Sequence, residues 1–330
     1  MELTTVWFAL ITLLWAGYFL LEGFDFGVGV LLPVLGRDNR ERRLIINTIG
    51  PVWDGNEVWL VVAGGATFAA FPEWYATLFS GFFLPLLFIL IALIIRGVSF
   101  EYRGKRDDER WRRRWDWCIF GGSLVPAVLW GVAFGNIVRG VPLDAGHEYI
   151  GGFFNLLNPY ALLGGLTTLV LFALHGAVFI ALKTDGEMRE RAGKLAATLS
   201  VPAIVIAAGF LLWTGVAHFD AIGVIIFVVA ALALIGAAAA TRLRREGWAF
   251  LATALTLVLA VAGLFVTLFP NVMPALDPAN SLTVDNASST PYTLKVMTWV
   301  AVAFTPLVVA YQGWTYWVFR KRLTIDRIPA

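Results

Sequence analysis

The sequence is poor in the residues that build metal and haem sites. Its 330 residues include one cysteine, Cys118, and three histidines, His147, His175 and His218. A lone cysteine excludes an intrachain disulfide and any metal or iron–sulfur site made of several cysteines. Three histidines leave little scope for a haem held by two histidines of this chain. We therefore predict no metal site.

Charged residues are also scarce. Only 15% of the residues are charged and 59% are hydrophobic, with a mean hydropathy of +0.75. Soluble domains carry about 25% charged residues, so this chain has too little polar material to cover a soluble globule. The start MELTTVW lacks the basic segment of a secretory signal, and the apolar run that follows is too long for one. The sequence predicts a multi-pass membrane protein that retains its first helix. We expect it to contact lipid and not to bind nucleic acid.

Apolar runs of about 20 residues, enough to cross a bilayer as a helix, recur along the chain. We predict an all-α polytopic fold with about nine transmembrane helices. The predicted spans are 5–33, 48–71, 74–102, 112–138, 155–183, 192–217, 221–242, 248–269 and 293–320.

A faint internal repeat suggests how these spans are grouped. The first span ends in LLPVLGRDNRERRL and the fifth in ALKTDGEMRERAGKL, which places His175 close to the position of Asp25. Parallel repeats of this kind favour two four-helix bundles plus one additional helix within a single membrane domain. The bundles would occupy residues 1–138 and 139–269, and residues 270–330 would form an outer loop, the ninth helix and a cytoplasmic tail. The alternative interpretation is that the two similar segments are ordinary cytoplasmic turns and that the chain has no internal repeat.

Small residues and one polar loop complete this outline. Gly23 and Gly27, like Gly131 and Gly135, stand four residues apart and predict close contacts between helix backbones. Residues 270–295 are rich in proline, asparagine and serine. This loop could cap a neighbouring subunit, but the sequence slightly favours a solvated connector.

Lysine and arginine fall almost entirely on one side of the predicted spans. Of the 25, all but Arg96, Arg139 and Lys295 lie in alternate loops or in the tail, which share one side. The positive-inside rule makes that side cytoplasmic. The N-terminus is then outside and the C-terminus in the cytoplasm.

Four carboxylates lie where a bilayer makes them expensive. Glu22 and Asp25 stand in the first span beside GFDFGVG, and Asp54 and Glu57 stand in the second within WDGNEVW. A charge at the bilayer centre costs about 2.5–3.5 kcal/mol on the insertion scale. The members of each pair share a helix face, because they are three residues apart. Arg96 in the third span is the obvious fixed cation at a similar depth.

These five groups permit two interpretations. Helix rise places them about 9–12 Å or somewhat more from the cytoplasmic ends of their spans. Four acids facing one arginine cannot all ionise in a low dielectric, so at least one should hold a proton near neutral pH. The first interpretation is a proton relay that opens to the cytoplasm. The second is a static salt bridge of Arg96 with Asp54 or Asp25, and both can hold together.

Three further titratable residues lie near the same layer. His175, about 12 Å deep, fits a hydrogen-bonded core histidine better than a ligand. Asp116 and Glu101 stand near the cytoplasmic boundary, where we expect them to be solvated or to cap helix ends.

At these residues the sequence resembles a known family, subunit II of the cytochrome bd-type quinol oxidases of bacterial respiratory chains. WDGNEVW is highly specific, whereas spans six to eight are generic. The matching stretches are GFDFGVG (23–29), ERRLIINTIGPVWDGNEVWLVVAGGATFAAFP (41–72), FSGFFLPLLFILIALIIRGVSFEYR (79–103), WDWCIFGGSLVPAVLWGVAFGN (115–136), GGFFNLLNPYALLGGL (151–166) and SLTVDNASSTPYTLKVM (281–297).

The resemblance implies a non-haem subunit of a terminal oxidase in the bacterial plasma membrane. Such a complex oxidises a quinol and reduces dioxygen to water with cytoplasmic protons. Its haem b and haem d groups and its quinol-oxidation site belong to subunit I, a related nine-helix chain paired with this one about a pseudo-twofold axis. No catalytic residue is then expected in this chain. A structural quinone and small single-helix accessory subunits are partners that the resemblance leaves open.

The resemblance also implies roles for individual residues. Asp54 corresponds to the residue at the opening of the family's proton channel, and Asp25, Glu57 and Arg96 are carried over as its neighbours. The residues with supporting roles are Trp53, Asn56, Glu22, Glu101 and His175.

The alternative function is a proton-coupled secondary transporter, since buried acids and faint repeats are typical of that class. Two features argue against it. The charges cluster toward the inner side rather than at the midplane, and the spans lack glycine or proline breaks paired between the halves.

Overall fold

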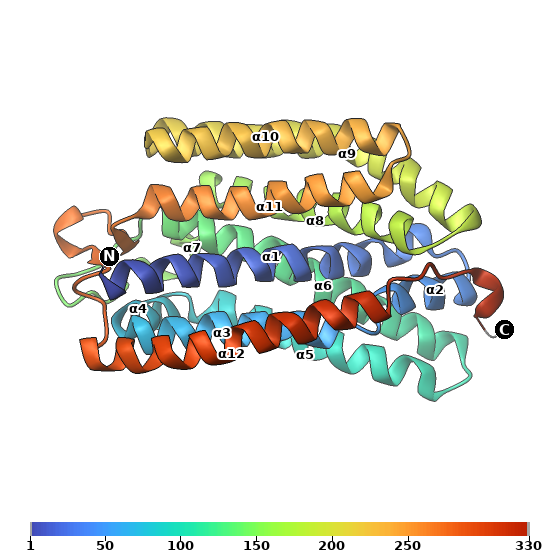
Figure 1. Ribbon diagram of the computed structural model, residues 1–330, viewed down its shortest axis with the longest axis horizontal. Helices are drawn as coiled ribbons and strands as arrows, with labels where there is room; N and C mark the ends of the chain where they lie inside the picture. The colour runs from blue at the N-terminus through green and yellow to red at the C-terminus, as the bar shows by residue number, and fades with distance from the viewer. Residues whose placement is uncertain (1, 329–330) are drawn as a thin grey trace.

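The structure, a computed structural model, describes residues 2–328 and consists mainly of long helices (Figure 1). The long helices are α1 (Leu3–Leu35), α3 (Trp53–Ala70), α5 (Phe83–Tyr102), α6 (Glu109–Arg139), α8 (Pro159–Lys183), α9 (Gly186–Ala217), α10 (Ala221–Arg242), α11 (Glu246–Leu268) and α12 (Pro291–Val318). The shorter helices are α2 (Asn39–Ile49), α4 (Pro72–Gly81) and α7 (Gly152–Asn155), with 3-10 turns η1 (Arg103–Lys105), η2 (Pro278–Asn280) and η3 (Ile325–Arg327). Two short strands, β1 (Asn271–Met273) and β2 (Leu282–Thr283), pair antiparallel.

The predicted all-α polytopic membrane fold is confirmed. Within residues 2–328, eight helices are long and apolar enough to cross a membrane. The remaining long helix, α3, falls below that hydropathy because its first turns carry Asp54, Asn56 and Glu57. The chain begins and ends at opposite ends of the molecule (Figure 1).

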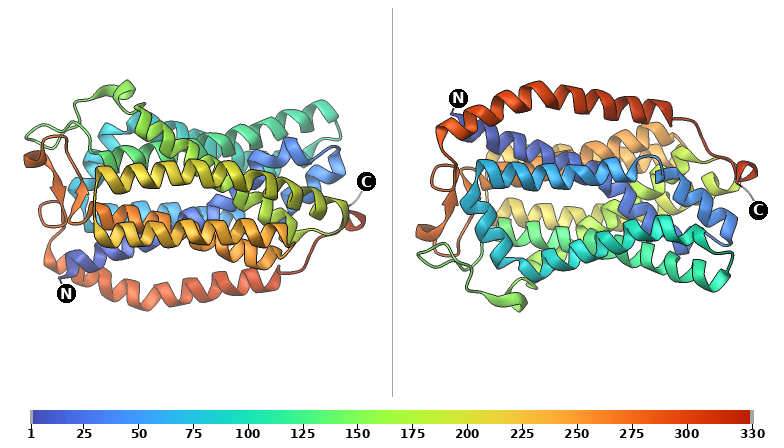
Figure 2. Two further views of the ribbon diagram at one scale, coloured as in Figure 1. Left: turned by 90° about the horizontal axis from the view of Figure 1, so that it is seen from above. Right: turned by 90° about the horizontal axis from the view of Figure 1, so that it is seen from below.

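The long helices form two groups of four that lie side by side. The first group contains α1, α3, α5 and α6, and the second contains α8, α9, α10 and α11. Both α1 and α6 pack against α8, where the groups meet. Helix α12 packs on α1 and α3 at one edge of the molecule (Figure 2), and most of its residues are exposed. This matches the predicted two bundles plus one helix, while the chain boundaries at residues 138 and 269 stay predictions.

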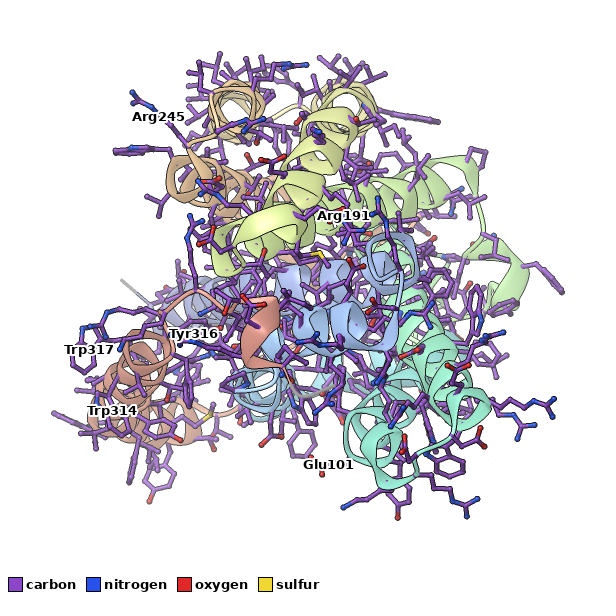
Figure 3. All side chains as sticks on the ribbon, turned by 90° about the vertical axis from the view of Figure 1, so that its right-hand side faces the viewer. Glu101, Arg191, Arg245, Trp314, Tyr316 and Trp317 are labelled. Atoms are coloured by element: carbon purple, nitrogen blue, oxygen red, sulfur yellow. The ribbon has the colours of Figure 1, made fainter. Side chains whose placement is uncertain are left out.

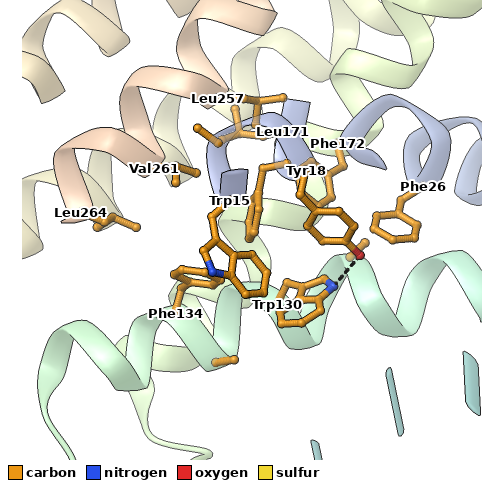
Figure 4. Packing of buried hydrophobic residues seen from close by; sticks show 14 of the residues in the cluster. Trp15, Tyr18, Phe26, Trp130, Phe134, Leu171, Phe172, Leu257, Val261 and Leu264 are labelled. Atoms are coloured by element: carbon orange, nitrogen blue, oxygen red, sulfur yellow. Dashed lines mark hydrogen bonds between the residues drawn. The ribbon is translucent and has the colours of Figure 1, made fainter. Parts of the chain in front are cut away.

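Aromatic side chains fill the junction between α1 and α6 (Figure 4). The ring of Trp15 meets Trp130 and Phe134 edge-on, with centroids 5.1 and 5.0 Å apart. The indole N–H of Trp130 donates to the Tyr18 hydroxyl at 3.0 Å. Edge-to-face contacts add stability beyond the buried area, so this cluster fixes how the two helices are rotated against each other.

Glycines bring α8 against both α1 and α6. A Cβ on Gly27 would collide with the backbone of Phe172 and Gly176, and one on Gly131 would collide with the Gly164 carbonyl. Only glycine permits this approach of two backbones. The predicted close contacts at Gly27 and Gly131 are therefore confirmed.

The second predicted span, 48–71, is interrupted. Helix α2 ends at Ile49, and a turn at Gly50–Val52 separates it from α3, which begins at Trp53. Pro51 has no backbone N–H to continue a helix. Asp54 therefore lies in the first turn of α3 and not six residues inside a continuous span. The third span, 74–102, is likewise divided into α4 and α5 at Phe82.

The outer loop is packed and not a solvated connector, so that expectation was wrong. Val272, Met273 and Leu282 are fully buried. Bridges join Val141 to Ala275, and the Asn280 side chain donates to the Leu143 carbonyl at 2.9 Å. Residues 270–290 thus cover the end of the molecule at which α1 begins (Figure 1).

Ion pairs gather the basic segments at the other end, here called the arginine-rich end. Arg37 pairs with Glu187 at 2.8 Å, and Arg191 pairs with Glu41 at 2.6 Å. Arg322 of the tail lies 3.6 Å from Glu246. Segments that the sequence placed on one side of the membrane therefore share one end of the molecule.

Candidate functional site

A buried ion pair joins α1 to α5. Arg96 Nη1 donates to Glu22 Oε2 at 2.9 Å, and both side chains are fully buried. Glu57 of α3 lies 3.8 Å from the same nitrogen, with its side chain 22% exposed. The guanidinium also sits over the rings of Phe26 and Phe100, 4.9 and 5.4 Å from their centroids. One cation thus holds two acids from different helices.

Asp25 lies beside this pair but points to a different partner. Its Oδ2 accepts from Asn56 Nδ2 at 2.7 Å, and the side chain is fully buried. Its Oδ1 has no hydrogen-bond partner in residues 2–328, and the same holds for Glu22 Oε1 and for two nitrogens of Arg96. We call Glu22, Asp25, Asn56, Glu57 and Arg96 the acid cluster. It contains three carboxyl groups for one guanidinium.

Two residues of α12 orient Asn56, and sequence reasoning missed both. Gln312 Nε2 donates to Asn56 Oδ1 at 3.2 Å, and the Tyr316 hydroxyl donates to the same oxygen at 2.6 Å. The Trp59 indole in turn donates to Gln312 Oε1 at 2.7 Å. A sequence signal existed, because Gln312 is a lone amide within an otherwise apolar and aromatic span.

These hydrogen bonds run in one direction. An indole N–H can only donate, so Gln312 must accept from Trp59 with its oxygen and donate with its nitrogen. Asn56 then accepts on Oδ1 and donates on Nδ2, which obliges Asp25 Oδ2 to accept. Oδ1, the oxygen without a partner in residues 2–328, is the Asp25 oxygen left for a proton, because the other already accepts from Asn56.

The remaining predicted residues lie around the acid cluster or apart from it. Asp54 is exposed in the first turn of α3, three residues before Glu57. Trp53 packs on the Phe100 ring with centroids 5.0 Å apart, and so supports the ring that contacts Arg96. Glu101 is exposed at the end of α5. It lies away from Tyr316, the residue of α12 that bonds to Asn56 (Figure 3).

His175 does not join the acid cluster. Its Nδ1 lies 2.6 Å from the Thr253 hydroxyl, and its ring stacks on Phe250 at 4.7 Å. These contacts face α11, as expected of a hydrogen-bonded core histidine.

Two expectations were wrong, one about the salt bridge of Arg96 and one about the surroundings of Asp116. Arg96 pairs with Glu22 and Glu57, not with Asp54 or Asp25. Asp116 is 4% exposed and neither solvated nor a cap. It accepts from Arg103 at 2.5 Å and from Arg42 at 3.0 Å.

A second feature is an apolar cavity of about 140 Å³ among α6, α8, α9, α10 and α11. Its lining contains no charged side chain. The hydroxyls of Thr167, Thr168 and Thr256 along it already donate to helix carbonyls. The cavity therefore suits an apolar chain better than the polar ring of a quinone. No group of three or more metal-ligating side chains occurs in residues 2–328.

Comparison with known proteins identifies the family. A family model described as cytochrome bd terminal oxidase subunit II matches residues 3–319. The chain belongs to this family. The predicted resemblance is confirmed, and a subunit II implies a complex with a subunit I. Family membership decides against the secondary transporter that buried acids alone also fit.

Named relatives cover nearly the whole subunit II chain. It is 44% identical over 329 residues to cytochrome bd ubiquinol oxidase subunit 2 of Bacillus subtilis, covering 98% of this chain and 97% of that one. It is 37% identical over 362 residues to cytochrome bd-I ubiquinol oxidase subunit 2 of Escherichia coli K12, covering 98% and 96%. The structure of bd oxidase from Geobacillus thermodenitrificans matches with a TM-score of 0.80 at 19% identity, covering 97% of this chain and 99% of that one, and shows the shared fold alone.

Proposed function

We propose that this chain is the non-haem subunit of a quinol-oxidising, dioxygen-reducing complex and supplies its proton path from the cytoplasm. The observation that carries the proposal is the acid cluster, with three carboxyl groups around one guanidinium and carboxyl oxygens left without partners. Ionisable groups buried in a membrane are costly, and proton relays are among their main uses. A wholly static role would favour matched charges.

The path begins at Asp54. This side chain is exposed in the first turn of α3, shortly after α2, and α2 contacts the tail at the arginine-rich end. Glu57 follows one turn inward on the same face of α3 and is itself partly exposed. Arg96 links Glu57 to Glu22 inside the protein, and Asp25 lies one turn from Glu22 on α1. Protons would pass along these carboxyls while Arg96 balances the charge that remains.

The same residues indicate where subunit I binds. Asp54 shares a face of α3 with Val58 and Val61, whose side chains are exposed. A carboxylate on a face turned toward lipid would be expensive, so another protein is expected to cover it. We propose that the haem-bearing subunit I covers α3 together with the exposed faces of α5 and α12. This chain then delivers protons toward the partner.

The histidines of this chain do not fit a haem site. His175 is bound to Thr253, and His147 Nδ1 lies 2.9 Å from the Asn280 carbonyl in the packed outer loop. His218 stands at the outer end of α9 beside Tyr160. We therefore place haem b, haem d and the quinol-oxidation site in subunit I. The positive-inside rule makes the arginine-rich end cytoplasmic and the start of α1 external.

The test is the rate of quinol-driven oxygen consumption by the purified complex. Asp54→Asn and Glu57→Gln should each lower turnover about tenfold or more, because a proton-carrying group is lost. Haem content should stay unchanged. Glu109→Gln at the start of α6, an exposed acid at the same end, is the matched control. Unchanged turnover in an assembled Asp54→Asn complex would contradict the proton path, and loss of haem would show a role in assembly.

A further inference from the structure

A polar pocket opens at the arginine-rich end, on the second bundle. It lies among α8, α9, α10 and α11 and has a volume of about 400 Å³. Arg245, which follows α10, lies across the molecule from Trp314 of α12 (Figure 3), so this bundle is remote from the face proposed for subunit I. The charged residues that line the pocket are Asp185, Arg189, Glu190, Lys194, Arg242, Arg244 and Glu246.

The charges that line the pocket do not cancel. Arg189 bonds to Glu246 at 2.8 Å and lies 3.9 Å from Asp185. Arg322 of the tail lies 3.6 Å from Glu246. These two arginines and two acids together carry no net charge. Three basic side chains of the lining have no ion pair within residues 2–328, and Glu190 is the one acid left to oppose them. These three are Lys194, Arg242 and Arg244.

The inner wall of the pocket is apolar and continues onto the membrane-facing surface. Small apolar side chains of the helix ends line it: Val178, Ala181, Ala196, Ala197 and Ala249. One turn further along α9 from Ala197, Val201 is 52% exposed. Trp248 is 64% exposed in the first turn of α11 and suits the membrane interface. The pocket therefore spans the boundary between headgroups and acyl chains.

We propose that this pocket binds the headgroup of an anionic phospholipid. Lys194, Arg242 and Arg244 hold the phosphate and its charge, and the acyl chains run along the apolar wall. Basic pockets between membrane helices at the cytoplasmic surface recognise anionic headgroups by this combination. Because Glu190 offsets only one of these three positive charges, the pocket keeps a net positive charge. A small anion lacks acyl chains to contact the apolar wall, so we expect it to bind more weakly than a phospholipid. The bound lipid would hold α9 against the α10–α11 turn.

The test measures the thermal unfolding of the purified, delipidated complex in detergent. Mixed micelles of phosphatidylglycerol should raise the unfolding temperature of the native protein by several degrees, and phosphatidylcholine with the same chains should not. Each basic side chain near an anionic surface gives roughly a fivefold gain in binding. The combined Lys194→Gln, Arg242→Gln and Arg244→Gln variant should therefore need roughly a hundredfold more phosphatidylglycerol for the same shift.

The matched control removes three exposed basic residues at the same end, outside the pocket. Lys105→Gln, Arg110→Gln and Arg113→Gln change the net charge equally and should leave the response to phosphatidylglycerol intact. Equal loss in both triple variants would show a diffuse charge effect and overturn the site. An equal response to phosphatidylcholine would overturn it too.

A second variant fills the pocket without removing charge. Gly193 lines it, and a Cβ there would meet no atom within 4 Å. Gly193→Leu favours the helix, because leucine is the better helix former, so the protein should assemble even where the triple variant does not. Its response to phosphatidylglycerol should be lost, and a retained response would refute the site. Inorganic pyrophosphate is the soluble probe, and protection by it equal to that by phosphatidylglycerol would assign the pocket to a soluble anion and overturn the lipid proposal.

Discussion

Two clusters of acids and arginines have opposite charge ratios, and their arginines Arg96 and Arg103 stand seven residues apart in α5 and η1. The acid cluster has three carboxyl groups for Arg96 and leaves oxygens of Glu22 and Asp25 without partners. The second, here called the arginine cluster, has Arg42 and Arg103 for the single carboxylate of Asp116.

The two clusters differ in how fully their carboxyl oxygens are bonded. Both oxygens of Asp116 accept from guanidinium groups, and Arg103 also donates to Asn39 at 3.1 Å. The arginine cluster therefore ties α2 and α6 together, whereas the acid cluster leaves Glu22 Oε1 and Asp25 Oδ1 without hydrogen-bond partners in residues 2–328.

The largest expected effect comes from removing the only cation of the acid cluster. Arg96→Gln leaves Glu22 buried without its partner and should cost about 3–5 kcal/mol of stability. We expect low yields of complex, measured by haem content and thermal unfolding. Arg103→Gln is the comparison, because Asp116 keeps Arg42, and it should be distinctly milder. Equal losses from both variants would remove the distinction between the clusters.

Asp116→Asn should lower stability without lowering turnover. It leaves two arginines close together without a carboxylate, and lost charged hydrogen bonds cost about 1.5–3 kcal/mol each at most. Thermal unfolding should shift down, while oxygen consumption per haem stays native. A fall in turnover per haem would mean that the arginine cluster belongs to the proton path.

Asp25→Asn should show the reverse pattern. Asn56 can still donate to the remaining side-chain oxygen, so the fold should hold. Oxygen consumption should fall about tenfold or more, because the position no longer accepts a proton. The measurement pairs turnover with thermal unfolding on the same preparation. A destabilised complex with native turnover per haem would contradict the role of Asp25.

The smallest effect is expected at the start of the directed hydrogen-bond chain. Trp59→Phe keeps an aromatic ring but removes the donor that orients Gln312. The loss should be about 1 kcal/mol, with turnover reduced only a few-fold. Trp248→Phe, an exposed tryptophan in the second bundle, is the control. A Trp59→Phe effect as large as that of Asp25→Asn would place Trp59 in the path itself.

The helices could be predicted from sequence because lipid demands long apolar runs, and the acids could be found because they violate that demand. Their pairing could not. Residues three apart on a helix still point about 60° away from each other, and this rotation sends Glu22 toward α5 while Asp25 faces α3. The turn at Gly50–Val52 also lay hidden inside an apolar run.

The contribution of α12 was beyond prediction for a different reason. Gln312 and Asn56 are 256 residues apart. The sequence around either residue does not indicate that the two side chains meet. The partners of Asp116 were missed because its position near the boundary suggested water, whereas η1 turns Arg103 back toward it.

The loose attachment of α12 has a consequence for biogenesis. Chains are made from the N-terminus, so this helix leaves the ribosome well after α1 and α3, against which it packs. Until it arrives, Asn56 lacks the two donors that set its amide, and α3 is open on that side. The nascent chain therefore carries an unfinished carboxyl site until α12 is made, and only insertion of α12 completes it.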